Sequence, residues 1–472
     1  MISTENMDFV HDFIAALDEE LRARHPKKGL TKTQKNWIAF CLTGIWVTKT
    51  FSWSEFSRQS LGAFKDGASS EMFRNSSIFW EGLLIAATTA MIKKYSITGG
   101  YLIIDDTDNP RSKSTSRISK VHKIYDKKTG GYFMGQNIVF LLLVTDKVTI
   151  PVGFKFYQPD PKKTEWIKND KKLRKAGFPK SKRPRKPEND PAFPTKIEIG
   201  MHLVEEFKKN FPTLKIQSII ADAAFGASIF FNGIQKIYPR AQVISQLQCI
   251  QKVLCDGKMV AVSQAFEGKS QKSSILIRGS ESKDVEMAFA CLKVQAHEKK
   301  RLIIAIRYEE EKDYRYIVAS KLNWEATDLA STYSLRWLVE VFIQDWKAHD
   351  GWGQFALQRG EKGSFQGMII SLLADQCLLF HPKQVQRIES NRPVCTAGSL
   401  RESVKNESIL SCFQEILTSD SPMDNFLAMK EKFEHYFKER DSRKHFSGRE
   451  MPKVKQTRSH KKTSKNLEPA YA

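Results

Sequence analysis

Between residues 100 and 247 the sequence alternates short apolar runs with segments of helical spacing, and this alternation restricts the fold most. Three β-rich runs come first, and two more follow, each of these two preceded by a segment of helical spacing. The expected strands lie at 101–106, 136–145, 149–157, 215–222 and 241–247. The expected helices among them lie at 197–211 and 228–238. Three strands, a helix, and then alternating strand and helix predict a mixed α/β sheet.

A chain of 472 residues exceeds the size of a single core, so two to four domains are expected. The first 98 residues have helical spacing, and Thr31 with Gln34 forms a predicted capping box. A DNA-gripping helix-turn-helix bundle and a plain helical domain both fit that region. Short strands with charged turns interrupt the α/β pattern later. We expect a helical domain at 1–98, a core at 99–246 and 323–385, a β-rich insertion at 247–322, and a helical C-terminal region with a basic tail at 386–472.

The net charge of the chain is +22, with a pI of about 9.5. A protein this basic usually contacts a polyanion, and nucleic acid is the commonest one. Between Lys162 and Lys186 there are 12 Lys or Arg residues against two acids, and between Lys438 and Lys465 there are 11. Both segments suit phosphate contact, which gives affinity without sequence specificity. The alternative for the first is a solvated charged loop, and the second is expected to be disordered.

The cysteines and the apolar runs argue against several classes of protein. The seven cysteines include no C-x-x-C pair and no histidine at zinc-ligand spacing, so a reduced protein without structural zinc is expected. The N-terminal MISTENMDF is polar and acidic, unlike a secretory signal. The longest apolar run, 138–144, is too short to span a bilayer and is typical of a buried strand.

Two of the expected strands end in aspartates. Asp105 and Asp106 end the first strand, with Asp108 just beyond, and Asp222 ends the fourth. Each alone is more often a turn former or a helix cap. Together they offer a hard divalent cation oxygen ligands from separate elements, at the strand ends where ligands of α/β sheets gather. Because successive strand residues face opposite sides, Asp105 and Asp106 cannot both enter the site, and periodicity leaves either open.

Residues 333–347, YSLRWLVEVFIQDWK, are predicted to form one amphipathic helix. Tyr333, Arg336, Glu340 and Lys347 fall within an arc of roughly 80° on its polar face. One explanation of this polar stripe is that it only faces solvent and has no chemical function. Alternatively, Glu340 supplies the third carboxylate that a two-metal site, with ions roughly 3.5–4 Å apart, requires.

The spacing Y-x2-R-x3-E-x6-K of that helix resembles the signature of bacterial insertion-sequence DDE transposases of the insertion sequence family 4 type. IIDDT resembles the family's first catalytic block, in which the acid stands directly before the threonine, and IIADAAFG resembles the second. The resemblance spans roughly residues 100–350. It selects Asp106, Asp222 and Glu340 as catalytic metal ligands.

For the remaining residues of the stripe, the resemblance implies contacts with phosphates near the cleaved DNA end, made by Tyr333, Arg336 and Lys347. It implies a ribonuclease H-like core, with the β-rich insertion lying between the second aspartate and the glutamate. The implied chemistry is cut-and-paste transposition, in which Mg²⁺-activated water nicks DNA at terminal inverted repeats and the freed 3′-hydroxyl later joins target DNA. Two Mg²⁺ ions per site are expected, with Mn²⁺ as an expected substitute.

The implied partners are double-stranded DNA, as terminal inverted repeats and as target, and a second copy of the chain in a homodimeric synaptic complex. No membrane partner is expected, and the implied location is the bacterial cytoplasm, on the nucleoid when DNA is bound. Two other interpretations stay open. One is a ribonuclease H-like DNA nuclease without strand transfer, and the other is a non-catalytic DNA-binding protein derived from a transposase.

Overall fold

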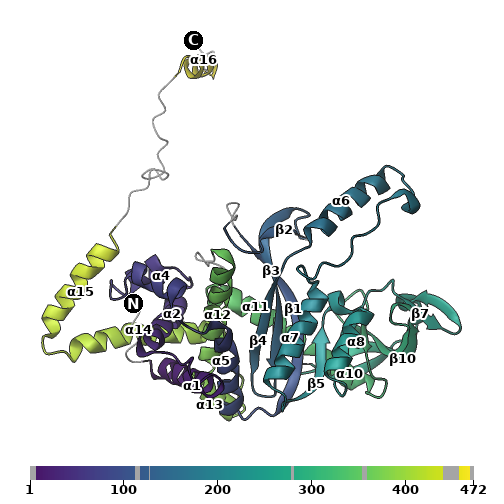
Figure 1. Ribbon diagram of the computed structural model, residues 1–472, viewed down its shortest axis with the longest axis horizontal. Coiled ribbons are helices and arrows are strands. Elements are labelled where there is room, and N and C mark those ends of the chain that lie inside the picture. Colours follow the sequence, from purple (N-terminus) through teal and green to yellow (C-terminus); the bar gives the residue numbers. More distant parts are fainter. Residues whose placement is uncertain are drawn as a thin grey trace.

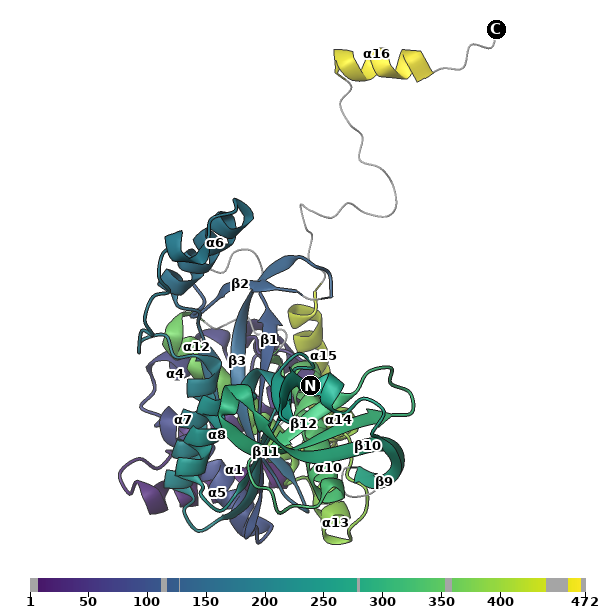
Figure 2. The ribbon, with the colours of Figure 1, turned by 90° about the vertical axis from the view of Figure 1, so that its right-hand side faces the viewer.

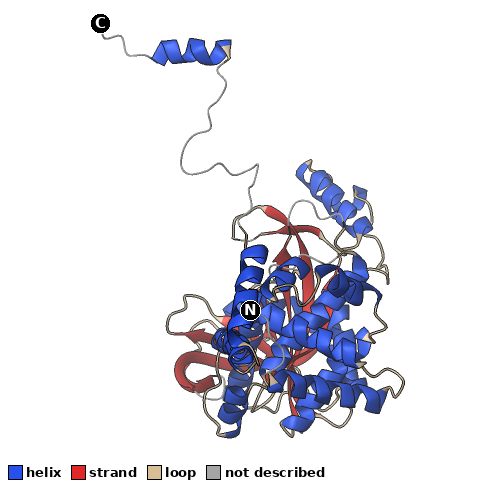
Figure 3. Cartoon of the chain, turned by 90° about the vertical axis from the view of Figure 1, so that its left-hand side faces the viewer, coloured by secondary structure: helices blue, strands red, loops and turns tan. Residues whose placement is uncertain are grey.

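The computed structural model describes residues 7–111, 117–126, 128–277, 281–352, 359–438 and 457–467. A helical bundle lies beside a large twisted sheet in Figure 1, and Figure 3 shows the bundle from its outer side. The N-terminal bundle helices are α1 (Asp8–Arg24), α2 (Lys32–Thr48), α3 (Trp53–Gln59), α4 (Asp66–Asn75) and α5 (Trp80–Lys94). The predicted capping box is confirmed, since the Thr31 side chain accepts from Gln34 N and the Gln34 side chain accepts from Thr31 N.

Helices from the C-terminal part of the chain complete this bundle. α12 packs against α2 and α5, and α14 packs against α2. The bundle therefore joins the N-terminal helices with α12 and α14 in one hydrophobic core. The C-terminal helices are α12 (Gly360–Leu378), α13 (Pro382–Glu389), α14 (Ala397–Leu417), α15 (Pro422–Tyr436) and α16 (Arg458–Leu467).

The mixed α/β sheet predicted from the sequence is confirmed. β1 lies near the middle of one half of the sheet, antiparallel to β3 and parallel to β5. The strand order through this half is β2-β3-β1-β5-β6, with β4 paired to β3. Apolar runs such as 138–144 are fully buried, as expected. The strands are β1 (Gly99–Pro110), β2 (His122–Tyr125), β3 (Tyr132–Val144), β4 (Thr149–Tyr157), β5 (Lys215–Ala221) and β6 (Gln242–Leu247).

The β-rich segment continues the same sheet, because β12 pairs antiparallel with β6, Tyr316 opposite Leu247. The order runs on as β6-β12-β11-β10-β7-β8, with β9 paired to β10. Its division from the core as a separate insertion domain, like the other predicted domain boundaries, stays a prediction. The elements are β7 (Lys252–Cys255), β8 (Lys258–Ala261), α9 (Val262–Ala265), β9 (Gln271–Ile277), β10 (Glu281–Val294), β11 (Lys299–Tyr308) and β12 (Arg315–Ala319).

Helices cover both faces of the first half of the sheet. α7 (Lys196–Asn210) and α8 (Ser228–Ile237) lie together on one side, as Figure 2 shows. On the other side the ring of Phe140 in β3 packs against Phe342 and Trp346 of α11 (Trp337–His349). β1 is therefore enclosed between α7 and α11.

Two segments differ from the sequence-based expectation. The lysine-dense stretch forms a helix, α6 (Pro161–Lys175), where a charged loop was the alternative to DNA contact. Asp160 caps it by accepting from Lys162 N at 2.8 Å, and Pro161 suits the first helical turn. Most of the basic tail lies outside the described residues, but α16 within it is helical.

Among the residues that the structure describes, no helix alone has the length and apolar composition of a membrane span; the bent pair α12 and α13 passes on those two criteria together.

Candidate active site

Asp105 and Asp106 lie inside β1, which continues to Pro110, so the prediction that they end this strand is wrong. The two residues face opposite sides of the sheet. In the β1–β3 register Asp105 lies opposite Phe140, whose ring packs on Phe342 of α11. Asp106 points the other way, and its carboxylate binds Lys196 at the start of α7. Paired residues of neighbouring strands project to the same face, so Asp105 belongs to the α11 side of β1 and Asp106 to the α7 side.

On the α11 side, Arg336 stands between two carboxylates. Its Nη1 donates to Asp105 Oδ2 at 3.0 Å, and its Nη2 donates to Glu340 Oε1. Glu340 lies in the first turn of α11, with its side chain 48% exposed. The Arg336 guanidinium therefore bridges Asp105 and Glu340. A metal ion bound by both carboxylates would occupy the same place.

The α10–α11 break, not one continuous helix, positions this arginine. α10 (Ala326–Ser334) ends three residues before α11 begins at Trp337, and Arg336 is the residue that precedes α11. The prediction of an unbroken helix over 333–347 is therefore wrong at its start. The turn places Tyr333 and Glu340 on separate helices.

Asp222 adds a second, half-buried carboxylate beside Asp105. It directly follows β5, the parallel neighbour of β1, and its side chain accepts from Ala224 N at 3.0 Å. Burial and the nearby Asp222 charge raise the pKa of Asp105 to about 7, although Arg336 opposes this. Burial also raises the pKa of Asp222. Two carboxylates that resist ionisation together are typical of a site that receives a cation.

On the α7 side, Asp106 already has its counter-ion. Its Oδ2 accepts from Lys196 Nζ at 2.7 Å and from Asn137 Nδ2 at 2.6 Å. Asn137 also donates to Asp108 Oδ1, so the amide holds the two acids of this face together. The Asp106 charge also raises the pKa of Asp222, so Asp222 neighbours both aspartates of β1. Arg336 pairs with Asp105, not with the Asp106 that the resemblance selected. Metal binding by either residue stays a prediction that variants decide.

The remaining predicted site residues make internal contacts. Tyr333 is 7% exposed, its hydroxyl donates to Gln246 Oε1 at 3.2 Å, and burial raises its pKa to about 12. Lys347 Nζ donates to Thr107 Oγ1 at 2.7 Å and to the Asp108 carbonyl at 2.6 Å. Burial lowers the pKa of Lys347. Tyr333 therefore packs inside the protein beside β6, and Lys347 links α11 to the last part of β1. The phosphate contacts predicted for both residues stay predictions.

Two site residues escaped sequence reasoning. Lys196 and Asn137 bind Asp106 from α7 and β3, respectively. Nothing about a lysine at the start of a predicted helix, or an asparagine inside an apolar run, marks either as a partner of an aspartate. Only the β1–β3 register, in which Asn137 lies opposite Asp108, brings them together.

The donor set fits a divalent cation in part. Among the described residues, no three His, Cys, Asp or Glu side chains stand close enough to hold a metal ion. Asp105 and Asp222 nevertheless supply two neighbouring carboxylates, and Mg²⁺ usually takes one or two carboxylates with waters and substrate phosphates. Glu340 is not among them, since its carboxylate accepts from Arg336 Nη2.

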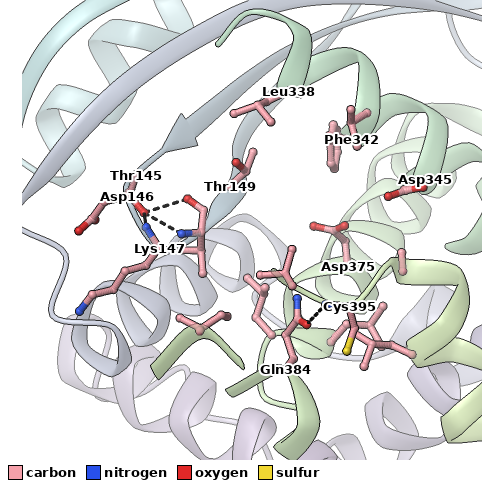
Figure 4. Close-up of a pocket in the computed structure, with 18 residues that line it drawn as sticks. Thr145, Asp146, Lys147, Thr149, Leu338, Phe342, Asp345, Asp375, Gln384 and Cys395 are labelled. Atoms are coloured by element: carbon pink, nitrogen blue, oxygen red, sulfur yellow. Dashed lines mark hydrogen bonds between the residues drawn. The ribbon is translucent and has the colours of Figure 1, made fainter. Parts of the chain in front are cut away.

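The cavity shown in Figure 4 is separate from this site. It has a volume of about 270 Å³ and lies on the opposite flank of α11, with Leu338 and Phe342 in its wall. Asp345 and Asp375 also line it, whereas the strand-end carboxylates do not.

Comparison with known proteins points to the same chemistry. Residues 29–263 match the family model described as DDE superfamily endonuclease. The chain is similar to a DDE endonuclease over that span. The match includes Asp105, Asp106 and Asp222 and ends before Glu340, and it supports a transposase-type nuclease. The finer resemblance to insertion sequence family 4 stays a prediction.

Two solved structures are similar at low identity. One is piggyBac transposase in a cryo-EM structure of its synaptic complex with hairpin DNA, at 11% identity and a TM-score of 0.42, covering 91% of this chain and 83% of that chain. The other is the crystal structure of the NurA nuclease from Sulfolobus solfataricus, at 9% identity and a TM-score of 0.20, covering 50% of this chain and 72% of that one. No curated protein sequence matches this chain.

Proposed function

We propose that this protein is a DNA transposase that cuts DNA by metal-dependent phosphoryl transfer and then joins the freed end to target DNA. The observation that carries the proposal is the meeting of Asp105 and Asp222 where the parallel pairing of β1 with β5 ends, with Glu340 held across Arg336. The span that matches DDE endonucleases and the net charge of +22 support it.

In this proposal the acidic residues hold the metal and the basic ones hold DNA. Asp105 and Asp222 would bind a divalent cation, with Glu340 as third ligand, and Asp106 is the ligand that the resemblance favours instead of Asp105. Mg²⁺, in two ions per site, is the proposed metal; when bound, it supplies an activated water and stabilises the leaving oxyanion.

Arg336 would couple DNA binding to completion of the acidic site. A guanidinium binds phosphate through two parallel hydrogen bonds, so an incoming DNA phosphate competes with both carboxylates for Arg336. Once Arg336 turns toward the phosphate, Glu340 is free to join Asp105 and Asp222. Its exposed position in the first turn of α11 leaves room for that movement.

The lysines of α6 would give the proposed DNA a second contact. A groove of about 860 Å³ lies between α6 and β2, lined by His122 and by four lysines of α6 (Lys168, Lys171, Lys172 and Lys175). The segment after α6 packs back on this helix, because Arg183 Nη1 pairs with Asp170 at 2.6 Å and Trp166 Nε1 donates to the Pro184 carbonyl at 2.8 Å. These contacts hold α6 in place. A fixed row of lysines suits the phosphates of a duplex.

The finer points of the proposal follow the sequence resemblance. The DNA is the terminal inverted repeats of the protein's own insertion sequence together with a target duplex. The active assembly is a homodimer that synapses two ends, and the protein works in the bacterial cytoplasm, on the nucleoid.

The test is an incubation of the protein with Mg²⁺ and labelled DNA that carries the repeats flanking its own coding sequence. We expect nicks with 3′-hydroxyl ends and then joined products. Asp222→Asn and Glu340→Gln should abolish both while DNA binding persists. Asp284→Asn, at an exposed position of β10, is the matched control and should behave as wild type.

A nuclease without strand transfer is the second candidate, because the matching family is described as an endonuclease and that description does not include joining. Cleavage without joined products would favour it. Binding with no cleavage by the wild-type protein would refute both enzymatic proposals and leave a DNA-binding protein.

A further inference from the structure

The end of α14 and all of α15 form a helical hairpin that the other described residues leave largely uncovered. The earlier part of α14 is anchored, since Leu400 and Val404 are buried and Arg401 Nε donates to the Trp46 carbonyl at 2.6 Å. Beyond Ser411 the described part of α14 has no buried residue, and α15 has none. In Figure 1 the hairpin lies on the side of the bundle away from the sheet.

This hairpin concentrates exposed apolar side chains. Of the 21 exposed large hydrophobic residues among those that the structure describes, eight lie between residues 410 and 437. We name these eight the hairpin patch: Leu410, Phe413, Leu417, Met423, Phe426, Leu427, Phe433 and Phe437. The three on α14 are spaced i, i+3 and i+7; on α15, Met423, Phe426 and Leu427 are spaced i, i+3 and i+4, and Phe433 follows Phe426 by seven. Each helix therefore has an apolar stripe like that of a buried helix, and no other described element covers it.

The hairpin is a preformed surface, not a loose extension. Asn425 Nδ2 donates to Ser419 Oγ at 2.8 Å across the turn between the helices. At the far end of α15, Tyr436 lies directly against Gly62, where a side-chain carbon would collide with its hydroxyl. Both ends of the hairpin are thus fixed to the bundle, so a partner would dock without first ordering it.

The size of the patch matches one side of a protein interface. Eight leucine, methionine and phenylalanine side chains, each between 37% and 73% exposed, present roughly 800 Å² of apolar area. A stable interface buries about 800 Å² on each partner, and the largest apolar patch of a typical monomer is about 300–600 Å².

Local charge identifies the partner as a second copy of this chain. Between Ala397 and Lys438 the sequence has seven acidic and five Lys or Arg residues, in a chain whose net charge is +22. DNA is excluded, because a polyanion would meet net negative charge here. Two copies of a strongly basic protein repel each other over most of their surfaces, and that repulsion is smallest where the local charge is slightly negative.

We propose that the hairpin patch is a self-complementary dimer interface, in which α14 and α15 of one copy pack on the same helices of the other. Closed two-fold contacts of this kind are the commonest in homo-oligomers. This deepens the homodimer of the proposed function by giving it a surface, but the contact needs neither DNA nor metal, so it can be tested apart from catalysis.

The test is the molar mass of the full chain, measured without DNA by light scattering at about 1–50 µM chain, the range that resolves micromolar dimers. We expect a dimer for the wild type and a monomer for Leu417→Glu combined with Phe426→Glu. The two side chains are 73% and 44% exposed, so the melting temperature should stay within about 1 °C of wild type. The matched control is Ile250→Glu, which changes a residue 72% exposed outside the hairpin and should stay dimeric.

A wild-type protein that is monomeric across the whole range would overturn the proposal, whether another protein or another segment of the chain covers the patch instead. So would a double variant that stays dimeric with an unchanged melting temperature. Either result leaves the cleavage assay of the proposed function unaffected, so the two failures are distinguishable.

Discussion

Replacing Asp105 by asparagine should stabilise the metal-free protein while removing its activity. Asp105 is 9% exposed, lies beside Asp222, and has a pKa of about 7 against an ordinary value of 3.8. Above pH 7 the folded protein must therefore hold a carboxylate whose ionisation its surroundings oppose. Asparagine keeps the shape of the side chain and removes that charge.

The magnitude follows from the pKa. A rise of roughly 3 pKa units corresponds to about 4 kcal/mol, at 1.36 kcal/mol for each unit. The raised pKa already includes the attraction of Arg336, so nothing more is subtracted for losing that charged partner, and the arginine still pairs with Glu340. The expected gain at pH 8 is therefore about 4 kcal/mol.

The gain should depend on pH in a defined direction. The folded-state pKa of Asp105 lies above the unfolded value, so its contribution to stability is complete below about pH 4 and is lost as the pH rises to 7. The variant lacks this term, so its advantage over wild type should be largest at pH 8 and absent at pH 4.

Thermal unfolding at pH 8 and pH 4, in EDTA and then in excess Mg²⁺, measures the effect. At about 2–4 °C for each kcal/mol, the metal-free variant should melt about 8–16 °C above wild type at pH 8. Mg²⁺ should raise the wild-type transition and leave that of the variant unchanged. The companion variant Asp106→Asn loses a carboxylate already paired with Lys196, so it should be neutral or less stable. Stabilisation by Asp106→Asn and none by Asp105→Asn would refute the reasoning.

Three other substitutions test the surroundings of the site. Trp346→Ala removes a fully buried ring whose Nε1 donates to Ser371 Oγ at 2.8 Å, and should lower the free energy of unfolding by about 3–5 kcal/mol in chemical denaturation. Asp350 is fully buried, neither carboxylate oxygen has a partner among the described residues, and burial raises its pKa. Asp350→Asn should therefore raise the melting temperature at pH 8, and this gain should shrink as the pH falls toward 4. Lys347→Met removes the hydrogen bond to Thr107 and should slow cleavage at least tenfold in single-turnover assays without changing the melting temperature by more than a few degrees; an unchanged rate would show that the tie between α11 and β1 is dispensable.

The sheet could be predicted from the sequence because its strands are continuous apolar runs. Residues 138–144 are all buried in β3, and a run of that composition and length has few alternatives to a central strand. The Thr31–Gln34 capping box could also be predicted, since it depends only on two residues that are three positions apart. Local chemistry and burial therefore fixed the elements and their order.

The face of β1 that carries the site could not be predicted in this way. The alternation of side chains along a strand predicts that Asp105 and Asp106 point to opposite faces. Which of the two meets Arg336 depends on the face of the sheet on which α11 packs, and that contact joins residues over 200 positions apart. The break before Arg336 has no glycine or proline to mark it. By contrast, Asp160 and Pro161 are a typical start of a helix and could have predicted α6. The prediction was missed because the sequence that follows is highly charged and has no apolar periodicity.

The most direct test of the central claim is a metal-specificity switch at β1. A cysteine thiolate is a soft ligand that binds Mg²⁺ poorly and accepts Mn²⁺ better, so it reports whether the replaced residue contacts the metal. Cleavage of the repeat-bearing DNA is measured for Asp105→Cys and Asp106→Cys in each metal. We predict that Asp105→Cys is inactive in Mg²⁺ and regains cleavage in Mn²⁺, whereas Asp106→Cys shows no such switch. The reverse pattern, or full activity of Asp105→Cys in Mg²⁺, would contradict the assignment of Asp105 to the metal site.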